Sequence, residues 1–268
     1  MPFDIPNAES LGFPKDEDDK SLPDGLSNGI IGPTIALSID SKIKYPWTDS
    51  IPKGIFLEYV TPYANVNEAR SNWRPYFHEK IDSILQPFLQ NHTASIEDII
   101  HALDEHVWSI FSNDESRSIF FKSGQTPLIY DPMSILAFGY ASCTGLSIFL
   151  IDILRTSGIP ARLAGTNAWN GKRENGNHSW IEFFGSDNKW HIMEAKPASG
   201  MSGDKKLTDP CQWWFCNSEK VEDTSFYAVR YDRCANDSVS FPLAWDSENL
   251  DIIGEDRSDF MRSLCSNC

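Results

Sequence analysis

The segment from residue 143 to residue 157 constrains the fold more than any other part of the chain, because most of its positions are apolar or small. Read at helical spacing, the side chains from Leu146 to Leu154 leave almost no polar face, which indicates a helix buried on nearly all sides. Gly158 is expected to end this helix, and Pro160 prevents its continuation. The segment therefore predicts a helix in the interior of the fold.

The residue pattern changes after this helix. Residues 161–165, 179–184 and 189–194 are expected strands, separated by turns that contain Asn, Gly and Asp. A further strand is expected at 227–231. A buried helix followed by sequential strands predicts an α+β fold with an antiparallel sheet.

Two helices are expected ahead of Cys143. Apolar residues recur at helical spacing in two segments: Phe77, Ile81, Ile84, Leu85 and Phe88, then Ile96, Ile99, Ile100, Leu103, Val107 and Trp108. Ser95 with Asp98 resembles a helix start, because a serine oxygen can accept the free amides of the first turn. The apolar faces of both helices are explained by core packing.

The 268 residues are enough for one large domain or two small ones. No internal repeat and no long linker divides the sequence, so we expect a single domain over about 45–250. Residues 1–30 are rich in Pro, Gly, Asp and Lys and are expected to form a mobile acidic arm. A loose tail is expected over 256–268.

The chain carries 38 acidic and 23 basic residues, a formal net charge of −15. Nucleic acid and anionic membranes both reward clustered Lys and Arg, so neither is expected as a partner. No apolar run reaches the roughly 20 residues that a membrane span needs. The simplest interpretation of the acidic charge is solubility.

Six cysteines stand at positions 143, 211, 216, 234, 265 and 268. The N-terminus lacks the basic start and apolar core of a signal peptide, which predicts a cytoplasmic protein with mostly reduced cysteines. The pairs 211/216 and 265/268 are irregularly spaced for a zinc site, and the last four residues lack the aliphatic pair of a prenylation box. No metal is therefore expected.

Cys143 is the expected thiol nucleophile. The thiolate is the reactive form, and a cysteine at a helix N-terminus gains from the positive end of the helix dipole and from free backbone amides. Thr144 and Gly145 are expected to leave room around it. A lone buried cysteine is more often a small apolar side chain, so this interpretation depends on the residues that accompany it.

Two further residues complete a pattern of thiol, base and carboxylate. His178 lies in Asn-His-Ser-Trp beside an expected strand, and Glu194 follows four residues after Trp190. A facing histidine can take the thiol proton, and a carboxylate can fix the imidazole tautomer and stabilise its charged form. Taken singly, each residue is more often structural. His191 is the rival base, but in a regular strand it points opposite to Trp190.

Four motifs between residues 132 and 197 carry a family resemblance. They are Gly139-Tyr140-Ala141-Ser142-Cys143-Thr144-Gly145, Leu154-Arg155-x-x-Gly158-Ile159-Pro160-Ala161-Arg162, Asn177-His178-x-Trp180-x-Glu182, and Trp190 with Glu194. Together they resemble the transglutaminase-like superfamily of papain-fold cysteine enzymes. Three flanking segments resemble microbial transglutaminase-domain proteins: Glu58-Tyr59-x-x-Pro62-Tyr63, Asn72-Trp73-Arg74 and Phe241-Pro242-Leu243-x-Trp245.

The resemblance implies a papain-like core in which the helix carrying Cys143 packs on an antiparallel sheet carrying His178 and the acid. It implies a triad with Cys143 as nucleophile, His178 as base, and Glu194 where the family usually has Asp. The oxyanion would be held by the backbone amide of Cys143 and an upstream side chain, for which Trp108 and Gln125 are candidates. No cofactor is expected, because the chain has no nucleotide loop, dinucleotide fingerprint, His-Glu-x-x-His motif or calcium loop.

The resemblance also implies cysteine-dependent acyl transfer at an amide bond of a protein or peptide substrate, through a thioester. Water as acceptor would make the protein a peptidase or amidase, and a lysine-like amine would make it a crosslinking acyltransferase. One alternative is a catalytically inactive interaction module that keeps the fold. Another is peptide:N-glycanase-like deglycosylation, although the Cys-x-x-Cys zinc motifs of those proteins do not occur before Cys143.

Overall fold

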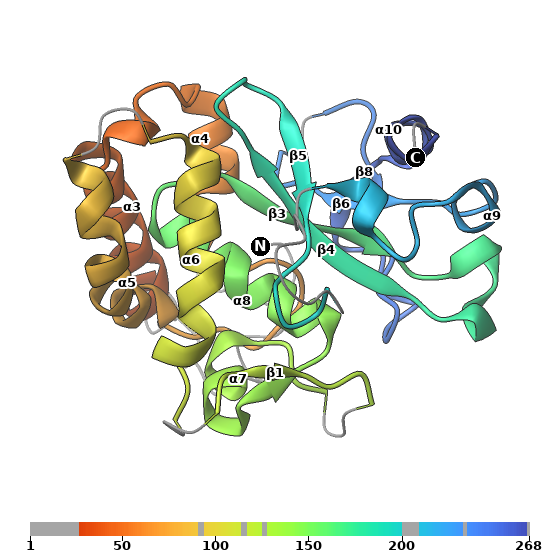
Figure 1. The fold of residues 1–268 in the computed structure, drawn as a ribbon, viewed down its shortest axis with the longest axis horizontal. Helices are drawn as coiled ribbons and strands as arrows, with labels where there is room; N and C mark the ends of the chain where they lie inside the picture. The colour runs from red at the N-terminus through yellow and green to blue at the C-terminus, as the bar shows by residue number, and fades with distance from the viewer. Residues whose placement is uncertain are drawn as a thin grey trace, which may run out of the picture.

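The computed structural model describes residues 27–90, 94–113, 117–124, 128–199, 209–232 and 235–266. The helices α3 to α6 (residues 32–110) lie on one side of the molecule and an antiparallel sheet on the other, with α8 (Cys143–Thr156) between them, while α9 (Ser218–Val221) and α10 (Ser258–Cys265) lie at the far side of the sheet (Figure 1). The α+β class expected from the sequence is confirmed. Residues 1–26 of the expected acidic arm lie outside the described residues.

The helical side is formed by the first part of the described chain. It contains α3 (Gly32–Lys44), α4 (Lys53–Tyr59), α5 (Trp73–Leu89) and α6 (Ile96–Ile110), with the short helices η1 (Ser27–Ile31) and η2 (Pro46–Thr48). α5 and α6 confirm the two helices expected ahead of Cys143. α6 begins with a capping box, because the Ser95 side chain accepts the Asp98 amide while the Asp98 carboxylate accepts the Ser95 amide.

Within the described residues, the main sheet has six strands in the order β5-β4-β3-β6-β8-β7, and each neighbouring pair is antiparallel. The strands are β3 (Ala161–Thr166), β4 (His178–Phe184), β5 (Trp190–Met193), β6 (Tyr227–Val229), β7 (Val239–Ser240) and β8 (Ile253–Asp256). β3, β4, β5 and β6 confirm the four expected strands. In the central pair, Thr166 lies opposite His178, so His178 stands where β3 ends.

Shorter elements connect and extend these layers. α7 (Pro132–Phe138) and α8 (Cys143–Thr156) precede the sheet, and β1 (Phe120–Phe121) pairs in parallel with β2 (Tyr140–Ala141) beside them. Further short helices follow: η3 (Trp169–Gly171), η4 (Arg173–Asn175), η5 (Pro210–Gln212), α9 (Ser218–Val221) and α10 (Ser258–Cys265).

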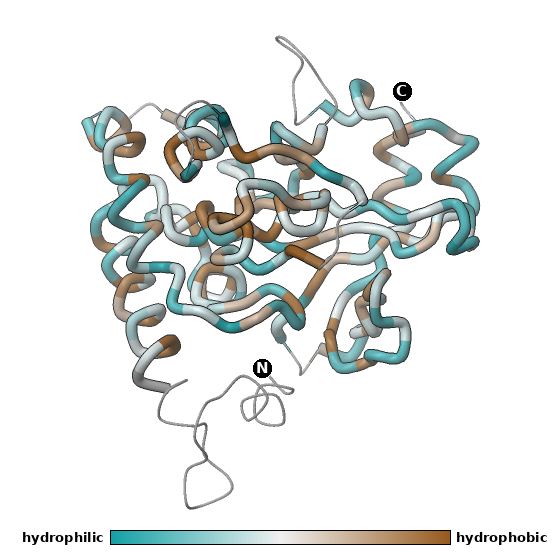
Figure 2. Tube along the Cα trace, turned by 90° about the horizontal axis from the view of Figure 1, so that it is seen from below, coloured by the Kyte–Doolittle hydropathy of each residue, from teal (hydrophilic) through white to brown (hydrophobic). Residues whose placement is uncertain are grey.

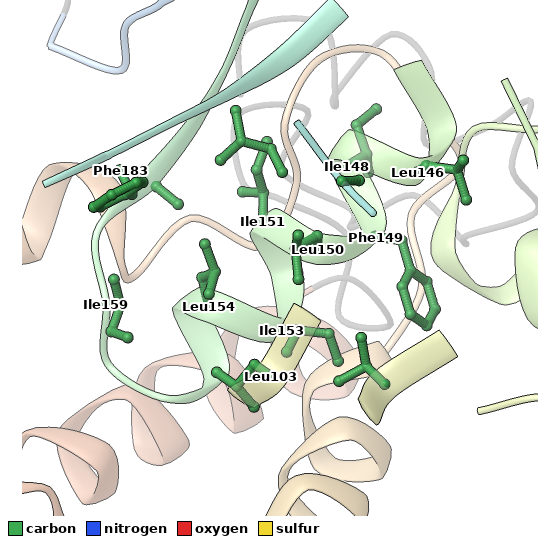
Figure 3. Close-up of a cluster of buried hydrophobic side chains, with 14 of the residues drawn as sticks. Leu103, Leu146, Ile148, Phe149, Leu150, Ile151, Ile153, Leu154, Ile159 and Phe183 are labelled. Carbon is green, nitrogen blue, oxygen red and sulfur yellow. The ribbon is translucent and has the colours of Figure 1, made fainter. Parts of the chain in front are cut away.

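α8 is the helix at the centre of the core. All of its residues are buried, because α3, α5 and α6 pack on it from one side and β3 and β4 from the other. Phe149 lies edge-on to Phe77 of α5, with ring centroids 5.0 Å apart. Figure 3 shows Leu103 of α6, Ile159 and Phe183 of β4 around the apolar side chains of α8. This enclosure explains the absence of a polar face in the sequence.

Gly145 allows the first turn of α8 to lie against neighbouring backbone. A Cβ atom at this position would come within 2.6 Å of the Ile129 carbonyl oxygen and within 2.7 Å of the Ala141 Cβ. The glycine therefore serves close backbone packing. The open space next to Cys143 lies on the side of Thr144, which lines the cleft with it.

A buried ion network crosses the sheet behind this core. Arg162 on β3 donates to Glu182 Oε2 from Nε at 2.9 Å and from Nη2 at 2.6 Å, and to Glu255 Oε1 at 2.8 Å. The other oxygen of Glu182 accepts from Arg257 Nε at 2.9 Å. The Arg162 guanidinium also lies 4.1 Å from the ring centroid of Trp190. The buried Glu182 is thus shared by the buried Arg162 and the partly buried Arg257.

The C-terminal part differs from the loose tail expected over 256–268. α10 packs against α9 and η5, and its Met261 is completely buried. Cys265 at its end is joined to Cys216 by a disulfide, with their Cα atoms 5.0 Å apart. The helix was not evident from the sequence because its apolar face is short and the crosslink is not encoded by spacing. The folded part also begins before residue 45, with α3.

The expectation of mostly reduced cysteines is therefore wrong for Cys216 and Cys265. Cys211 is disulfide-bonded as well, whereas Cys143 is a free thiol. The zinc site considered for positions 211, 216, 265 and 268 does not form from bonded sulfurs, because a metal binds the thiolate.

Replacing both Cys216 and Cys265 with serine is expected to lower the free energy of unfolding by about 2–4 kcal/mol, because the crosslink restricts the unfolded chain. The bond joins residues 49 apart in sequence, and the loop that it closes is long. Urea unfolding of the oxidised wild type and the double variant measures the difference. Intact mass after alkylation without reductant is the control, since bonded cysteines stay unlabelled. Equal stabilities with both thiols labelled in the wild type would contradict the crosslink.

The apolar and polar segments are distributed as this core requires. Hydrophobic stretches gather in the middle of the molecule, whereas many of the outer turns are hydrophilic (Figure 2). No helix in the described ranges is long and apolar enough to cross a membrane.

Candidate active site

Cys143 is the first residue of α8 and lies next to the beginning of β4. Ser142 occupies the N-cap position without capping the helix through its side chain, so the first amides of α8 face the site. Two contacts hold the helix start against the strand. Thr144 Oγ1 lies 3.1 Å from Ser179 Oγ, and Ser147 Oγ donates to the Ser179 carbonyl oxygen at 3.3 Å.

The structure brings the three residues expected from the sequence together. His178 Nε2 contacts Glu194 Oε1, and the His178 ring also hydrogen-bonds the Cys143 thiol. Since Nε2 is used by the carboxylate, Nδ1 is the nitrogen left for the sulfur. The register of β4 and β5 places Ile181 opposite Met193, the last residue of β5. Glu194 is the next residue in the chain and therefore lies beside the beginning of β4. All three side chains are buried.

The charges of Cys143 and His178 stabilise each other. Burial alone would raise the pKa of the thiol, but the hydrogen bond and charge of His178 and the backbone amides of Ser179 and Thr144 hold the pKa below its usual value. Burial would lower the pKa of His178, but its hydrogen bonds to Cys143 and Glu194 raise that pKa to about 9. Both shifts favour a thiolate beside an imidazolium near pH 7.

Aromatic rings enclose the His178 imidazole on the side away from α8. The ring centroid lies 5.3 Å from Phe215, 5.7 Å from Trp214, 5.9 Å from Trp180 and 6.5 Å from Trp169. These rings belong to a second apolar cluster or pack against it, separate from the core around α8. The candidate site therefore lies where the two clusters meet.

An open cleft of about 610 Å³ leads to Cys143 and His178. Its walls include Trp214, from the segment before α9, and Trp245, from the segment before β8. Both come from parts of the chain distant in sequence from the catalytic motifs. The cleft gives a substrate access to the thiol, although the thiol itself is largely covered.

The side chains considered for the oxyanion are not both in place. The Trp108 indole N–H donates to Asp104 Oδ1 at 2.9 Å inside the helical side, and Trp108 is absent from the walls of the cleft. Trp108 is therefore wrong as an oxyanion donor, because its only N–H is already bonded. Gln125 lies outside the described residues. The amide of Cys143 at the start of α8 is the expected donor that keeps its position near the sulfur.

Asp104 is a buried residue near the site that the sequence did not single out. Its Oδ1 also accepts the Lys196 amide at 3.1 Å, two residues after Glu194, and thus ties the end of β5 to α6. Burial raises the pKa of Asp104 to about 7, against the effect of these two N–H bonds. A helical Asp four residues before a Trp was the only sequence signal for this contact.

The rival base is directed elsewhere. His191 Nε2 lies 2.7 Å from Asp187 Oδ1, and both side chains are partly exposed. His191 also stacks on Phe183 and is absent from the walls of the cleft. Among the described residues, no group of three or more His, Cys, Asp or Glu side chains is gathered as metal ligands would be.

A thiol at the start of a central helix, beside an imidazole on an antiparallel sheet, is an arrangement used by cysteine enzymes. The model of the transglutaminase-like superfamily matches residues 84–195, which include all three candidate residues. This match agrees with the resemblance that the sequence motifs indicated. No curated protein matches the sequence significantly.

Three solved structures are similar at low scores. The periplasmic domain of TgpA from Pseudomonas aeruginosa, bound to ethylmercury, is 19% identical with a TM-score of 0.31, over 46% of this chain and 44% of that one. A structure described as a TGase is 16% identical with a TM-score of 0.31, over 53% and 36%. A candidate cysteine protease from Cytophaga hutchinsonii is 12% identical with a TM-score of 0.33, over 72% and 66%. The chain thus covers less than two thirds of each, and these likenesses are too distant to bear on activity.

Proposed function

We propose that the protein catalyses acyl transfer at an amide bond, with Cys143 as nucleophile, His178 as base and Glu194 as the orienting carboxylate. The observation that carries the proposal is the position of His178, which bonds both the Cys143 thiol and Glu194 at the end of an open cleft. The match of residues 84–195 to the model of the transglutaminase-like superfamily supports the same interpretation.

In the first half of the reaction, the Cys143 thiolate forms a bond to the amide carbon, and the carbonyl electron pair moves onto oxygen. The first amides of α8 stabilise this oxyanion. When the intermediate collapses, the carbon–nitrogen bond breaks and the leaving nitrogen takes the proton from the His178 imidazolium. The amine departs and a thioester to Cys143 remains.

In the second half, an acceptor resolves the thioester. Water or a second amine gives its proton to His178 as it attacks the thioester carbon, and the carbon–sulfur bond breaks to return the thiolate. Water yields hydrolysis and an amine yields transfer. Glu194 stabilises the charged imidazole in both halves, and its contact with Nε2 keeps Nδ1 directed at the sulfur.

Glu194 stands where the superfamily usually has Asp, and the geometry accommodates the extra methylene. The Glu194 carboxylate reaches Nε2 from the residue just beyond β5. The amide two residues later is fixed by Asp104. The longer acid is thus compatible with the role that the proposal gives it.

Alkylation of Cys143 by iodoacetamide is expected to be fast well below the usual thiol pKa of about 8.5. His178→Ala should slow it about tenfold or more at pH 6, because burial then raises the thiol pKa and reduces the fraction of thiolate. The remaining thiolate is more nucleophilic, but this gain offsets only part of the loss. The rate is measured from pH 5 to pH 10 by intact mass.

His191→Ala is the matched control for this experiment and should leave the profile unchanged, since that ring pairs with Asp187. Slow labelling of Cys143 that is insensitive to His178→Ala would contradict the proposal. It would favour the inactive interaction module expected as an alternative from the sequence.

The compartment in which the protein works is a separate question. The cytoplasmic location expected from the sequence stays a prediction. The Cys216–Cys265 disulfide argues against a cytoplasmic location, because cytosolic thiols are kept reduced in most organisms.

A further inference from the structure

The cleft over Cys143 is lined mainly by apolar side chains. Its larger side chains are Phe121, Leu128, Trp214 and Trp245, and small residues such as Ala198 and Ala244 lie between them. Apart from the Cys143–His178 pair, none of the described residues that line it has a charged side chain. The chain as a whole has a net charge of −15, so the walls around that pair are a mainly apolar surface on an acidic protein.

Much of this apolar surface faces solvent. Trp214 is 51% exposed, Leu128 42% and Phe121 39%. Large apolar side chains that gather at a concave surface commonly mark a binding site. Covering them with an apolar group of a substrate would remove this area from water, which is the main source of binding energy available here.

Trp214 is held firmly in its position as one wall. The Lys220 ammonium lies 4.7 Å from its ring centroid, and the Trp169 ring packs edge-on at 5.5 Å. Two residues later, the Cys216–Cys265 disulfide fixes the segment to α10. A wall fixed before binding saves the ordering cost that a mobile side chain would add.

Trp245 forms another wall and is fixed by different contacts. Its ring centroid lies 5.0 Å from that of Tyr130, and nearby Phe241 and Leu243 are buried in the core around α8. Apart from Cys143 and His178, the polar members of the lining are neutral, among them Ser142, Ser199 and Asn177. Such groups can bond a peptide backbone and do not attract a charged side chain.

We propose that the acyl donor is a peptide with an aromatic or large aliphatic side chain next to the attacked carbonyl, and that Trp214 determines this specificity by packing on that side chain. The inference rests on the proposed function, because it assumes that Cys143 attacks the donor. It ranks donors that present a carboxylate or an ammonium at the same position below these, since a charged group loses hydration beside apolar rings.

Two matched peptidyl electrophiles test the inference: acetyl-Ala-Ala-Phe and acetyl-Ala-Ala-Glu acyloxymethyl ketones. The second-order rate constant for labelling Cys143 is measured for each by intact mass, and the ratio of Phe to Glu rates is taken within the same protein. Any change in thiol reactivity cancels in this ratio. In the wild type the ratio is expected to be at least about 10, from the burial of one aromatic side chain.

Trp214→Ala should bring this ratio close to 1, and Trp214→Phe should retain part of it, which separates loss of the wall from loss of the fold. Leu250→Ala is the matched control, because Leu250 is exposed and does not line the cleft; its ratio should equal that of the wild type.

A wild-type ratio near or below 1, with fast iodoacetamide labelling, overturns the inference alone. So does an unchanged ratio in Trp214→Ala. Slow labelling by iodoacetamide and by both ketones overturns the proposed function, and the inference with it.

Discussion

Replacing Cys143 with alanine is expected to lower kcat/KM by about 10⁴-fold or more on any amide substrate that the wild type turns over. Without the sulfur no thioester forms, and His178 and the amides of α8 can only position water against an intact amide. Initial rates of amine release, with wild type and variant at equal concentration, measure the loss.

The fold should survive this change, which makes the result interpretable. Cys143 behaves as a small side chain at the helix start, so its truncation should change the free energy of unfolding by only about 1 kcal/mol. A variant that unfolds like the wild type and keeps its activity would place the nucleophile elsewhere. The triad would then be a structural feature of the helix–strand junction.

Replacing Glu182 with alanine is expected to lower the free energy of unfolding by about 3 kcal/mol, because it leaves the buried Arg162 with only the partly exposed Glu255 as its carboxylate partner. Both oxygens of Glu182 are bonded, one to Arg162 and the other to Arg257. Arg162 has no exposed surface from which to reach water. Urea unfolding at neutral pH measures the change.

Two further variants sharpen this test. Glu248→Ala removes an exposed carboxylate and should stay within about 0.5 kcal/mol of the wild type. The double variant Arg162→Met with Glu182→Leu should recover part of the loss, since apolar side chains can replace a buried ion pair. A cost below about 1 kcal/mol for Glu182→Ala would mean that water reaches the arginines when the carboxylate is absent, and that the network contributes little.

The centre of the fold was predictable because its signals are local. The helix at 143–156 has almost no polar face, and the capping box at Ser95 fixes the start of α6 through residues three apart. Strands β3 to β5 follow one another along the chain and pair as neighbours. The three candidate residues lie on these elements or, for Glu194, directly after β5, so the motifs were sufficient to bring them to one place.

The rest depended on contacts between distant segments. Trp214 reaches the cleft because α10 and the disulfide hold its segment, and nothing in the spacing of six cysteines specifies which of them pair. The indole N–H of Trp108 is not available to an oxyanion, because it donates to Asp104, four residues away on the same helix. The partners of buried polar groups are set by packing, which a single sequence does not display.

The sulfur chemistry of this molecule places opposite demands on its surroundings. Cys143 must remain a free thiol to react, whereas Cys216 and Cys265 must stay joined to keep Trp214 at the mouth of the cleft. A strongly reducing solution preserves the Cys143 thiol but breaks the disulfide. A strongly oxidising solution preserves the disulfide but can oxidise the Cys143 thiol. The burial of Cys143 eases the conflict, since oxidants reach a covered sulfur less readily. The molecule is thereby suited to intermediate redox potentials, at which one sulfur stays reduced beside a closed crosslink.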